Sequence, residues 1–130
     1  METETATNLE KIIENLRKSA SEQNLLPGEV ALDLKNEGYE PQDIAYILFH
    51  GLNVSGECLI EALALGSGFS LVETARAIFA GLWWSPSDLA GAFFNFNTSV
   101  REMGAGEAVI ETANILLKAG VFVADEDYDL

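Results

Sequence analysis

The sequence predicts an all-α protein built from short tandem helices, and three observations support this fold class. A repeat of 15 residues runs through the middle of the chain, in blocks that begin at Glu40, Ser55, Ser70 and Ser85. Each block opens with a helix-capping pattern and continues with apolar residues at helical spacing. Segments 30 residues apart also match, which indicates two helices per repeat. The chain should therefore form a compact solenoid or bundle.

An amphipathic helix over residues 5–20 is expected before the repeats. Its apolar residues share one helical face: Leu9, Ile12, Ile13 and Leu16. A looser copy of the repeat follows from Leu26, where Pro27 suits the first position of a helix. Together these segments lead into a repeat region that we expect to span residues 26–120.

Helix starts inside the repeats are predicted from local capping patterns. The pairs are Ser70 with Glu73, Ser85 with Asp88, Ser55 with Glu57 and, more weakly, Glu40 with Asp43. In this spacing the side chains at the helix start accept hydrogen bonds from free backbone N–H groups. The residue before each cap is apolar and should pack against the new helix: Tyr39, Val54, Phe69 and Trp84.

Helix ends are predicted at Gly51, Gly66 and Gly81, which occupy one column of the repeat. Glycine there could adopt the left-handed conformation that stops a helix. Two further columns should form the core. One holds the small residues Ala31, Ala45, Ala75 and Ala90, and the other holds Leu34, Leu48, Leu63, Ile78 and Phe93.

The repeat changes near the C-terminus. Residues 98–106 form an insertion, and a longer helix over residues 107–119 should close the array. We expect one domain over residues 1–124 and an acidic tail over residues 125–130. The tail's alternating carboxylates resemble the opening of a calcium loop, but the required glycine and final glutamate do not follow, so a solvated tail is the better interpretation.

The charge balance limits the functional classes. Seven Lys and Arg residues oppose 21 Asp and Glu residues, for a net charge of −14, and this field repels nucleic acid and anionic lipid. It favours a basic protein partner. The N-terminal segment lacks the pattern of a signal peptide and no apolar run of about 18 residues occurs, so a cytoplasmic location is expected.

The sequence has few residues suited to catalysis or metal binding, and no cofactor is expected. His50 is the sole histidine and Cys58 the sole cysteine, which excludes a histidine cluster or an intramolecular disulfide. Residues 41–63 resemble a helix-turn-helix, but the second helix carries Glu57 and Glu61 without a basic residue to read DNA. Carboxylate pairs such as Glu57 with Glu61 are typical of a solvated helix face, and an enzyme would need one of them in a dry pocket.

Two aromatic residues depart from the repeat and are candidate partner contacts. Trp83 stands in a column that holds Asn53 and Gly68 elsewhere, so the fold does not require an apolar residue there. Phe96 stands in the column of Gly51, Gly66 and Gly81, where it replaces the glycine predicted to end a helix. The candidate acidic contacts are Glu57, Glu61, Glu73, Asp88, Glu107, Glu111, Asp125, Glu126, Asp127 and Asp129.

Two functions fit these observations. The favoured one is a non-enzymatic inhibitor or decoy, a nucleic-acid mimic that occupies a basic channel of a partner, as phage-encoded antagonists of host nucleases do. The alternative is an interaction module that binds a partner, or a second copy of itself as a homodimer, through an aromatic patch. In that case the charge would serve only solubility.

Overall fold

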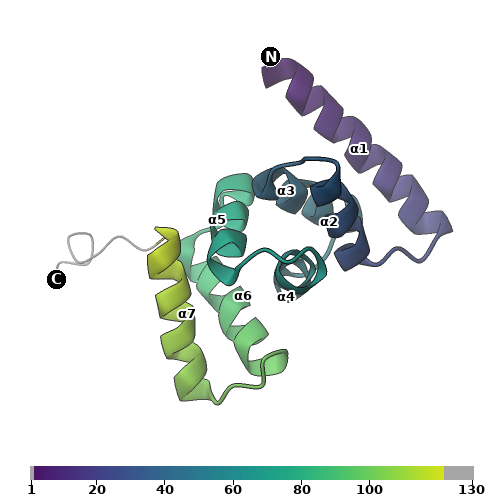
Figure 1. Ribbon diagram of the computed structural model, residues 1–130. Coiled ribbons are helices and arrows are strands. Elements are labelled where there is room, and N and C mark those ends of the chain that lie inside the picture. Colours follow the sequence, from purple (N-terminus) through teal and green to yellow (C-terminus); the bar gives the residue numbers. More distant parts are fainter. Residues whose placement is uncertain (1, 122–130) are drawn as a thin grey trace.

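The computed structural model describes residues 2–121, and all regular elements in that range are helices (Figure 1). The elements are α1 (Glu2–Glu22), α2 (Pro27–Asn36), α3 (Pro41–Leu52), α4 (Gly56–Glu61), the π-helical segment η1 (Ala62–Gly66), α5 (Leu71–Leu82), α6 (Pro86–Ser99) and α7 (Ala105–Ala119). The all-α prediction is confirmed. The first helix is longer than the predicted 5–20, and the last begins two residues before 107. The predicted tail, residues 125–130, lies outside the described residues.

The helices pack in two rows that run across the molecule (Figure 1). In one row α1 contacts α3, α3 contacts α5, and α5 contacts α7. In the other row α2 packs against η1, and α4 packs against α6. The rows join at the end of the chain, where α6 and α7 contact each other. Within each row, helices that are not adjacent in the chain pack together, while α6 and α7 are neighbours both in the chain and in space.

The predicted caps at the helix starts are confirmed for the three serine blocks. Ser70 and Glu73 form a reciprocal capping box, in which each side chain accepts a hydrogen bond of 3.0 Å from the other's backbone N–H. Ser55 Oγ accepts from the N–H of Cys58 at 3.2 Å, and Ser85 Oγ accepts from that of Asp88 at 3.1 Å. Glu40 makes no side-chain cap, which agrees with its weaker pattern.

The predicted helix ends are wrong by two residues at Gly51 and Gly81, whereas the segment η1 does end at Gly66. Gly51 and Gly81 lie inside α3 and α5, and the left-handed residues that end these helices are Asn53, with φ of 53°, and Trp83, with φ of 57°. Gly38 and Gly68 also have positive φ, at 95° and 81°. These four positions, 38, 53, 68 and 83, are spaced by 15 residues. The 15-residue sequence repeat therefore corresponds to a left-handed backbone residue that recurs every 15 positions.

The glycine column serves close approach between helices instead. A Cβ atom at Gly81 would lie 2.5 Å from the backbone oxygen of Gln42, at the start of α3. One at Gly66 would overlap the Cα atom of Gly28 in α2, and one at Gly51 would lie 3.0 Å from the side chain of Leu16 in α1. Only glycine permits the backbone contacts at Gly66 and Gly81, whereas Gly51 meets a leucine side chain; close approach accounts for the column better than helix termination does.

The two predicted core columns are confirmed, with Ala90 half-buried and the other members buried. Phe96 corrects a different prediction, because its side chain is only 1% exposed and belongs to the same core cluster. It lies inside α6, which continues past the glycine column to Ser99. A core aromatic cannot meet a partner on the surface of this fold, so Phe96 is removed from the candidate contacts.

Candidate protein-binding surface

Trp83 is the most exposed large apolar residue of the described chain, at 83% exposure. It caps the C-terminus of α5, where its N–H donates to the Phe79 carbonyl at 3.1 Å. A bulky residue with positive φ is a conformational outlier, because its Cβ crowds the neighbouring carbonyl. The fold thus holds a tryptophan at a position that favours glycine, and presents its indole to solvent. Backbone strain at a residue whose side chain adds little packing to the fold is typical of functional positions.

A pocket of about 550 Å³ opens beside this residue, between the end of α3 and the starts of α4 and α6. Its lining residues are Phe49, Ser55, Gly56, Glu57, Trp84, Ser87, Asp88, Gly91, Ala92 and Asn95. Trp84 follows Trp83 directly in the chain, so the exposed indole and the pocket belong to one region. We call Glu57, Trp83, Trp84 and Asp88 the acidic aromatic surface.

The aromatic wall of the pocket is fixed by packing. The Trp84 ring meets Phe49 nearly edge-on, with centroids 5.5 Å apart and an interplanar angle of 79°. A Cβ atom at Gly56 would lie 3.0 Å from the Ala92 methyl and 3.4 Å from the Trp84 indole. The missing side chain at Gly56 therefore lets α4 begin against α6 and the indole. The wall is rigid because two helices and a second aromatic ring hold it.

The acidic wall comes from the first turns of two helices. Glu57 lies in the first turn of α4, and Asp88 lies in the first turn of α6. A carboxylate in a first helical turn interacts favourably with the positive end of the helix dipole, so both charges are compatible with the fold. No basic side chain lines the pocket. Two of the predicted acidic contacts are thus brought together next to a third predicted contact, Trp83.

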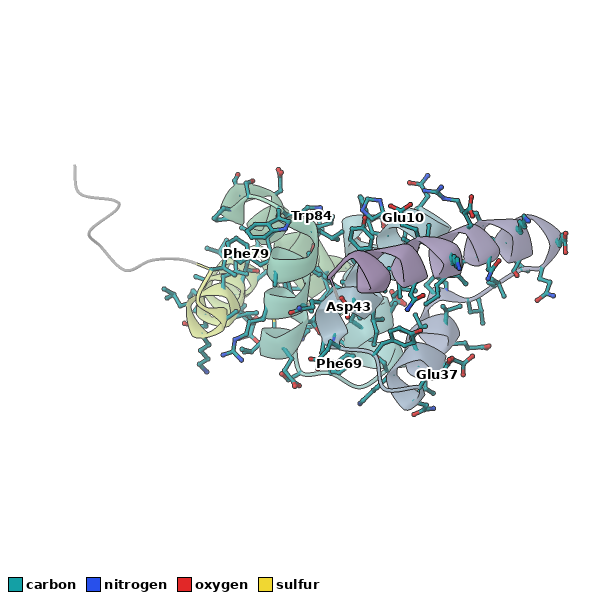
Figure 2. The ribbon with its side chains drawn as sticks, turned by 90° about the horizontal axis from the view of Figure 1, so that it is seen from above. Glu10, Glu37, Asp43, Phe69, Phe79 and Trp84 are labelled. Atoms are coloured by element: carbon teal, nitrogen blue, oxygen red, sulfur yellow. The ribbon has the colours of Figure 1, made fainter. Side chains whose placement is uncertain are left out.

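The remaining predicted carboxylates are dispersed. Glu61, although four residues from Glu57, lines a different groove with Cys58 and Leu65. Glu73 is held in its capping box beside a further groove that also contains Arg76. Glu107 lies in the first turn of α7. The charges therefore meet in the pair Glu57 and Asp88, and the other described candidates lie elsewhere. In Figure 2, Trp84 and Phe79 lie on the upper side of the molecule and Phe69 on the lower side.

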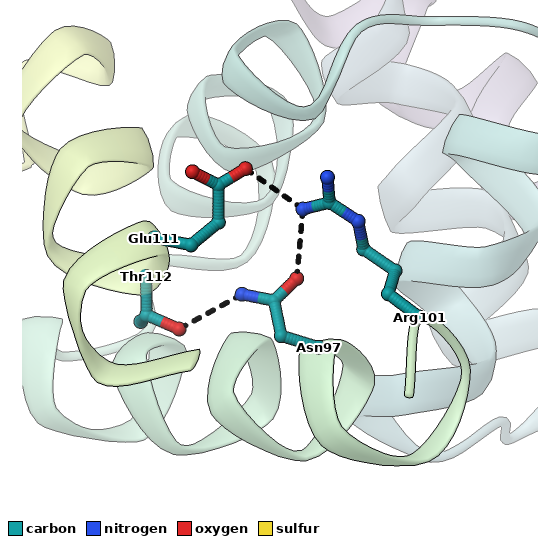
Figure 3. Close-up of polar contacts among 4 residues, drawn as sticks. All are labelled: Asn97, Arg101, Glu111 and Thr112. Carbon is teal, nitrogen blue, oxygen red and sulfur yellow. Dashed lines mark hydrogen bonds and ion pairs between the residues drawn. The ribbon is translucent and has the colours of Figure 1, made fainter. Parts of the chain in front are cut away.

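Glu111 belongs to a network that joins α6 to α7 (Figure 3). Its carboxylate accepts from Arg101 at 2.8 Å, and the same guanidinium nitrogen donates to Asn97 Oδ1 at 3.0 Å. The Asn97 amide then donates to Thr112 Oγ1 at 3.0 Å, and both of these side chains are buried. Glu111 is thus a structural residue that satisfies a buried polar group through Arg101.

Ionisable groups elsewhere show modest perturbation. The Ser70 backbone and hydroxyl hold the pKa of Glu73 below its usual range, since both bond the charged form. Burial, with a smaller effect of Glu40, raises the pKa of Asp43. Burial and then Glu61 raise the pKa of the Cys58 thiol, which keeps it protonated and unreactive. Among residues 2–121, no three His, Cys, Asp or Glu side chains gather as a metal site would require.

One exposed apolar face was missed by the sequence reasoning. Val109, Ile110 and Leu117 of α7 are 58%, 65% and 50% exposed. A groove of about 390 Å³ lies beside them, between α6 and α7, lined by Ala90, Gly91, Phe94, Val109, Thr112 and Ala113. The signal was present, because these apolar residues exceed what one buried helix face needs.

The comparisons with known proteins add no functional assignment. Protein-family models, curated proteins and solved structures yielded no match to the chain. Within the described residues, no helix combines the length and the apolar character needed to cross a bilayer.

Proposed function

We propose that this chain is a non-enzymatic protein that binds a basic protein partner through the acidic aromatic surface. The observation that carries the proposal is Trp83, an indole 83% exposed on a left-handed backbone. Exposed tryptophans anchored by rigid helices are frequent centres of protein interfaces. The fold gains little from this side chain, so an interaction outside the fold is the better reason for its presence.

The chemistry of the partner follows from charge. The chain carries a net charge of −14, and Glu57 and Asp88 line a pocket without a basic residue. A partner with a positive face would be steered to this surface and would neutralise both carboxylates. A partner with an acidic face would be repelled.

A finer form of the proposal is an acidic decoy that mimics nucleic acid in the basic channel of a partner such as a nuclease. Such a decoy needs carboxylates displayed at regular intervals, as a solenoid of two-helix repeats would display them. The dispersal of Glu61, Glu73 and Glu107 over separate elements favours a local contact at one surface over an extended mimic.

The second candidate is an interaction module that binds through apolar contacts or pairs with a second copy. The exposed face of Val109, Ile110 and Leu117 favours it. In that function the charge keeps the protein soluble, and binding would change little between low and high salt.

Affinity capture from host cells with four baits tests these proposals. The baits are the natural chain, Trp83→Gly, the double variant Glu57→Gln with Asp88→Asn, and the control Glu107→Gln with Glu61→Gln, which removes the same charge elsewhere. A protein retained by the natural and control baits, and lost with both site variants, would support the acidic aromatic surface. Retention that survives both site variants and high salt would contradict it in favour of the apolar face.

A further inference from the structure

We propose that the pocket between α4 and α6 receives the guanidinium group of one arginine side chain. This inference rests on the proposed function and specifies which chemical group of the partner enters. It commits to a protein side chain of defined shape, where the proposed function requires only a positive face. Three features of the pocket lead to it: the acceptors on its walls, the aromatic ring, and the absence of competing cations.

The lining residues offer enough acceptors for a guanidinium. Glu57 and Asp88 contribute carboxylates from two different helices, and Asn95 and Ser87 add side-chain oxygens along α6. A guanidinium carries five N–H donors in a fixed plane and can bond two carboxylates at once. A lysine ammonium has three donors around a compact, strongly hydrated charge, and it leaves part of this acceptor set unused.

The aromatic wall favours the same group. Trp84 lines the pocket with its ring braced by Phe49 and by the backbone of Gly56. Arginine packs its flat, weakly hydrated guanidinium against aromatic rings more readily than lysine packs its ammonium. Trp83, the chain neighbour of Trp84, is exposed and available to contact the partner outside the pocket.

Charge separates this pocket from two other hollows of the surface. The groove that holds Glu73 also contains Arg76, which would repel an incoming cation. The groove between α6 and α7 is lined by apolar residues and one threonine, without a carboxylate. The hollow between α1 and α2 also has two acidic residues, Asp33 and Glu37, and no basic one, but its aromatic residue is a tyrosine, so the tryptophan distinguishes the pocket between α4 and α6. Among these hollows, the pocket between α4 and α6 combines two carboxylates, a tryptophan and no basic side chain.

The test is an NMR titration of the full chain with three blocked pentapeptides, at low salt. Their central residue is arginine, lysine or citrulline between glycines, and citrulline keeps the shape of arginine without its charge. We expect saturable shifts at the Trp84 indole N–H, Gly91 and Asn95 with the arginine peptide. Binding should be about tenfold weaker for lysine and absent for citrulline. Asp88→Asn and Glu57→Gln should each weaken the arginine peptide about tenfold, while Glu107→Gln leaves it unchanged.

Any of three outcomes would overturn the inference. They are equal affinity for the arginine and lysine peptides, equal loss of affinity in Glu107→Gln and Asp88→Asn, and no saturation up to about 10 mM peptide. The spectrum of each variant reports its folding directly, and Glu57→Gln serves if Asp88→Asn disturbs α6. A failed titration with Trp83-dependent capture of a basic partner would reject the arginine pocket and leave the proposed function standing. Failure of both experiments would reject both.

Discussion

Replacing Trp83 with glycine should separate binding from folding. The backbone there has φ of 57°, which costs a residue other than glycine about 1–2 kcal/mol, so the substitution relieves strain. The side chain is 83% exposed, and removing its small buried part costs about 1 kcal/mol at about 25 cal/mol per Å². The free energy of unfolding should therefore change by less than about 1 kcal/mol, while loss of an interface tryptophan should weaken binding by about 2 kcal/mol or more.

Urea unfolding followed by circular dichroism measures the first quantity, and calorimetric titration with the captured partner measures the second. Asn53→Gly is the matched control, because Asn53 occupies the same column with φ of 53° and is also exposed. It should likewise change the free energy of unfolding by less than about 1 kcal/mol, and it should leave binding intact. Destabilisation of Trp83→Gly by more than about 2 kcal/mol would show that the indole supports the fold, and the reasoning from strain would fail.

Three further predictions test the fold around this surface. Gly81→Ala should destabilise the protein by about 1–3 kcal/mol in urea unfolding, because its methyl would meet a backbone oxygen at 2.5 Å. Gly91→Ala meets only open space and should stabilise α6 by about 0.5–1 kcal/mol. Equal effects of the two substitutions would contradict the close-approach interpretation. Phe96→Ala should cost about 3–5 kcal/mol in the same assay, and a cost below about 1 kcal/mol would contradict its place in the core. The lowered pKa of Glu73 means that its stabilising effect is present above its ordinary value of 4.5 and is lost as pH falls through the lower folded value. Ser70→Ala should raise that pKa only part of the way toward 4.5 in an NMR titration, because the backbone N–H of residue 70, the larger cause, remains; an unchanged pKa would contradict the contribution of the hydroxyl.

The helix starts could be predicted from the sequence because their chemistry is local. A serine and an acidic residue three positions later, such as Ser70 and Glu73, make their bonds within a single turn. The helix ends could not be located from glycine alone. A glycine can end a helix or admit a neighbouring backbone, and only the packing of α5 against α3 shows that Gly81 does the latter. The column of Asn53 and Gly68, two residues that tolerate a left-handed backbone, was the better signal.

Trp83 and Phe96 both depart from the repeat, and the pattern alone could not show which of them is buried and which is exposed. Whether each side chain is buried depends on α7, which follows the insertion and packs against α5 and α6. The core that α7 helps to close includes Leu116 and Phe96, whereas Trp83 lies on the turn between α5 and α6 and stays exposed. Departure from a repeat therefore identifies positions under a different constraint, and burial decides whether that constraint is packing or contact.

The acidic pocket can be understood as a consequence of how the helices are capped. Glu57 and Asp88 are first-turn acids, a placement that the helix dipole favours for reasons unrelated to any partner. They are 31 residues apart, yet they meet because α4 packs against α6 in one row of helices. Neutralising either charge should cost the fold only about 0.3–1 kcal/mol. A repeat that caps its helices with acids and packs alternate helices together thus places acidic residues from distant parts of the chain on one pocket, where the proposed arginine would bind.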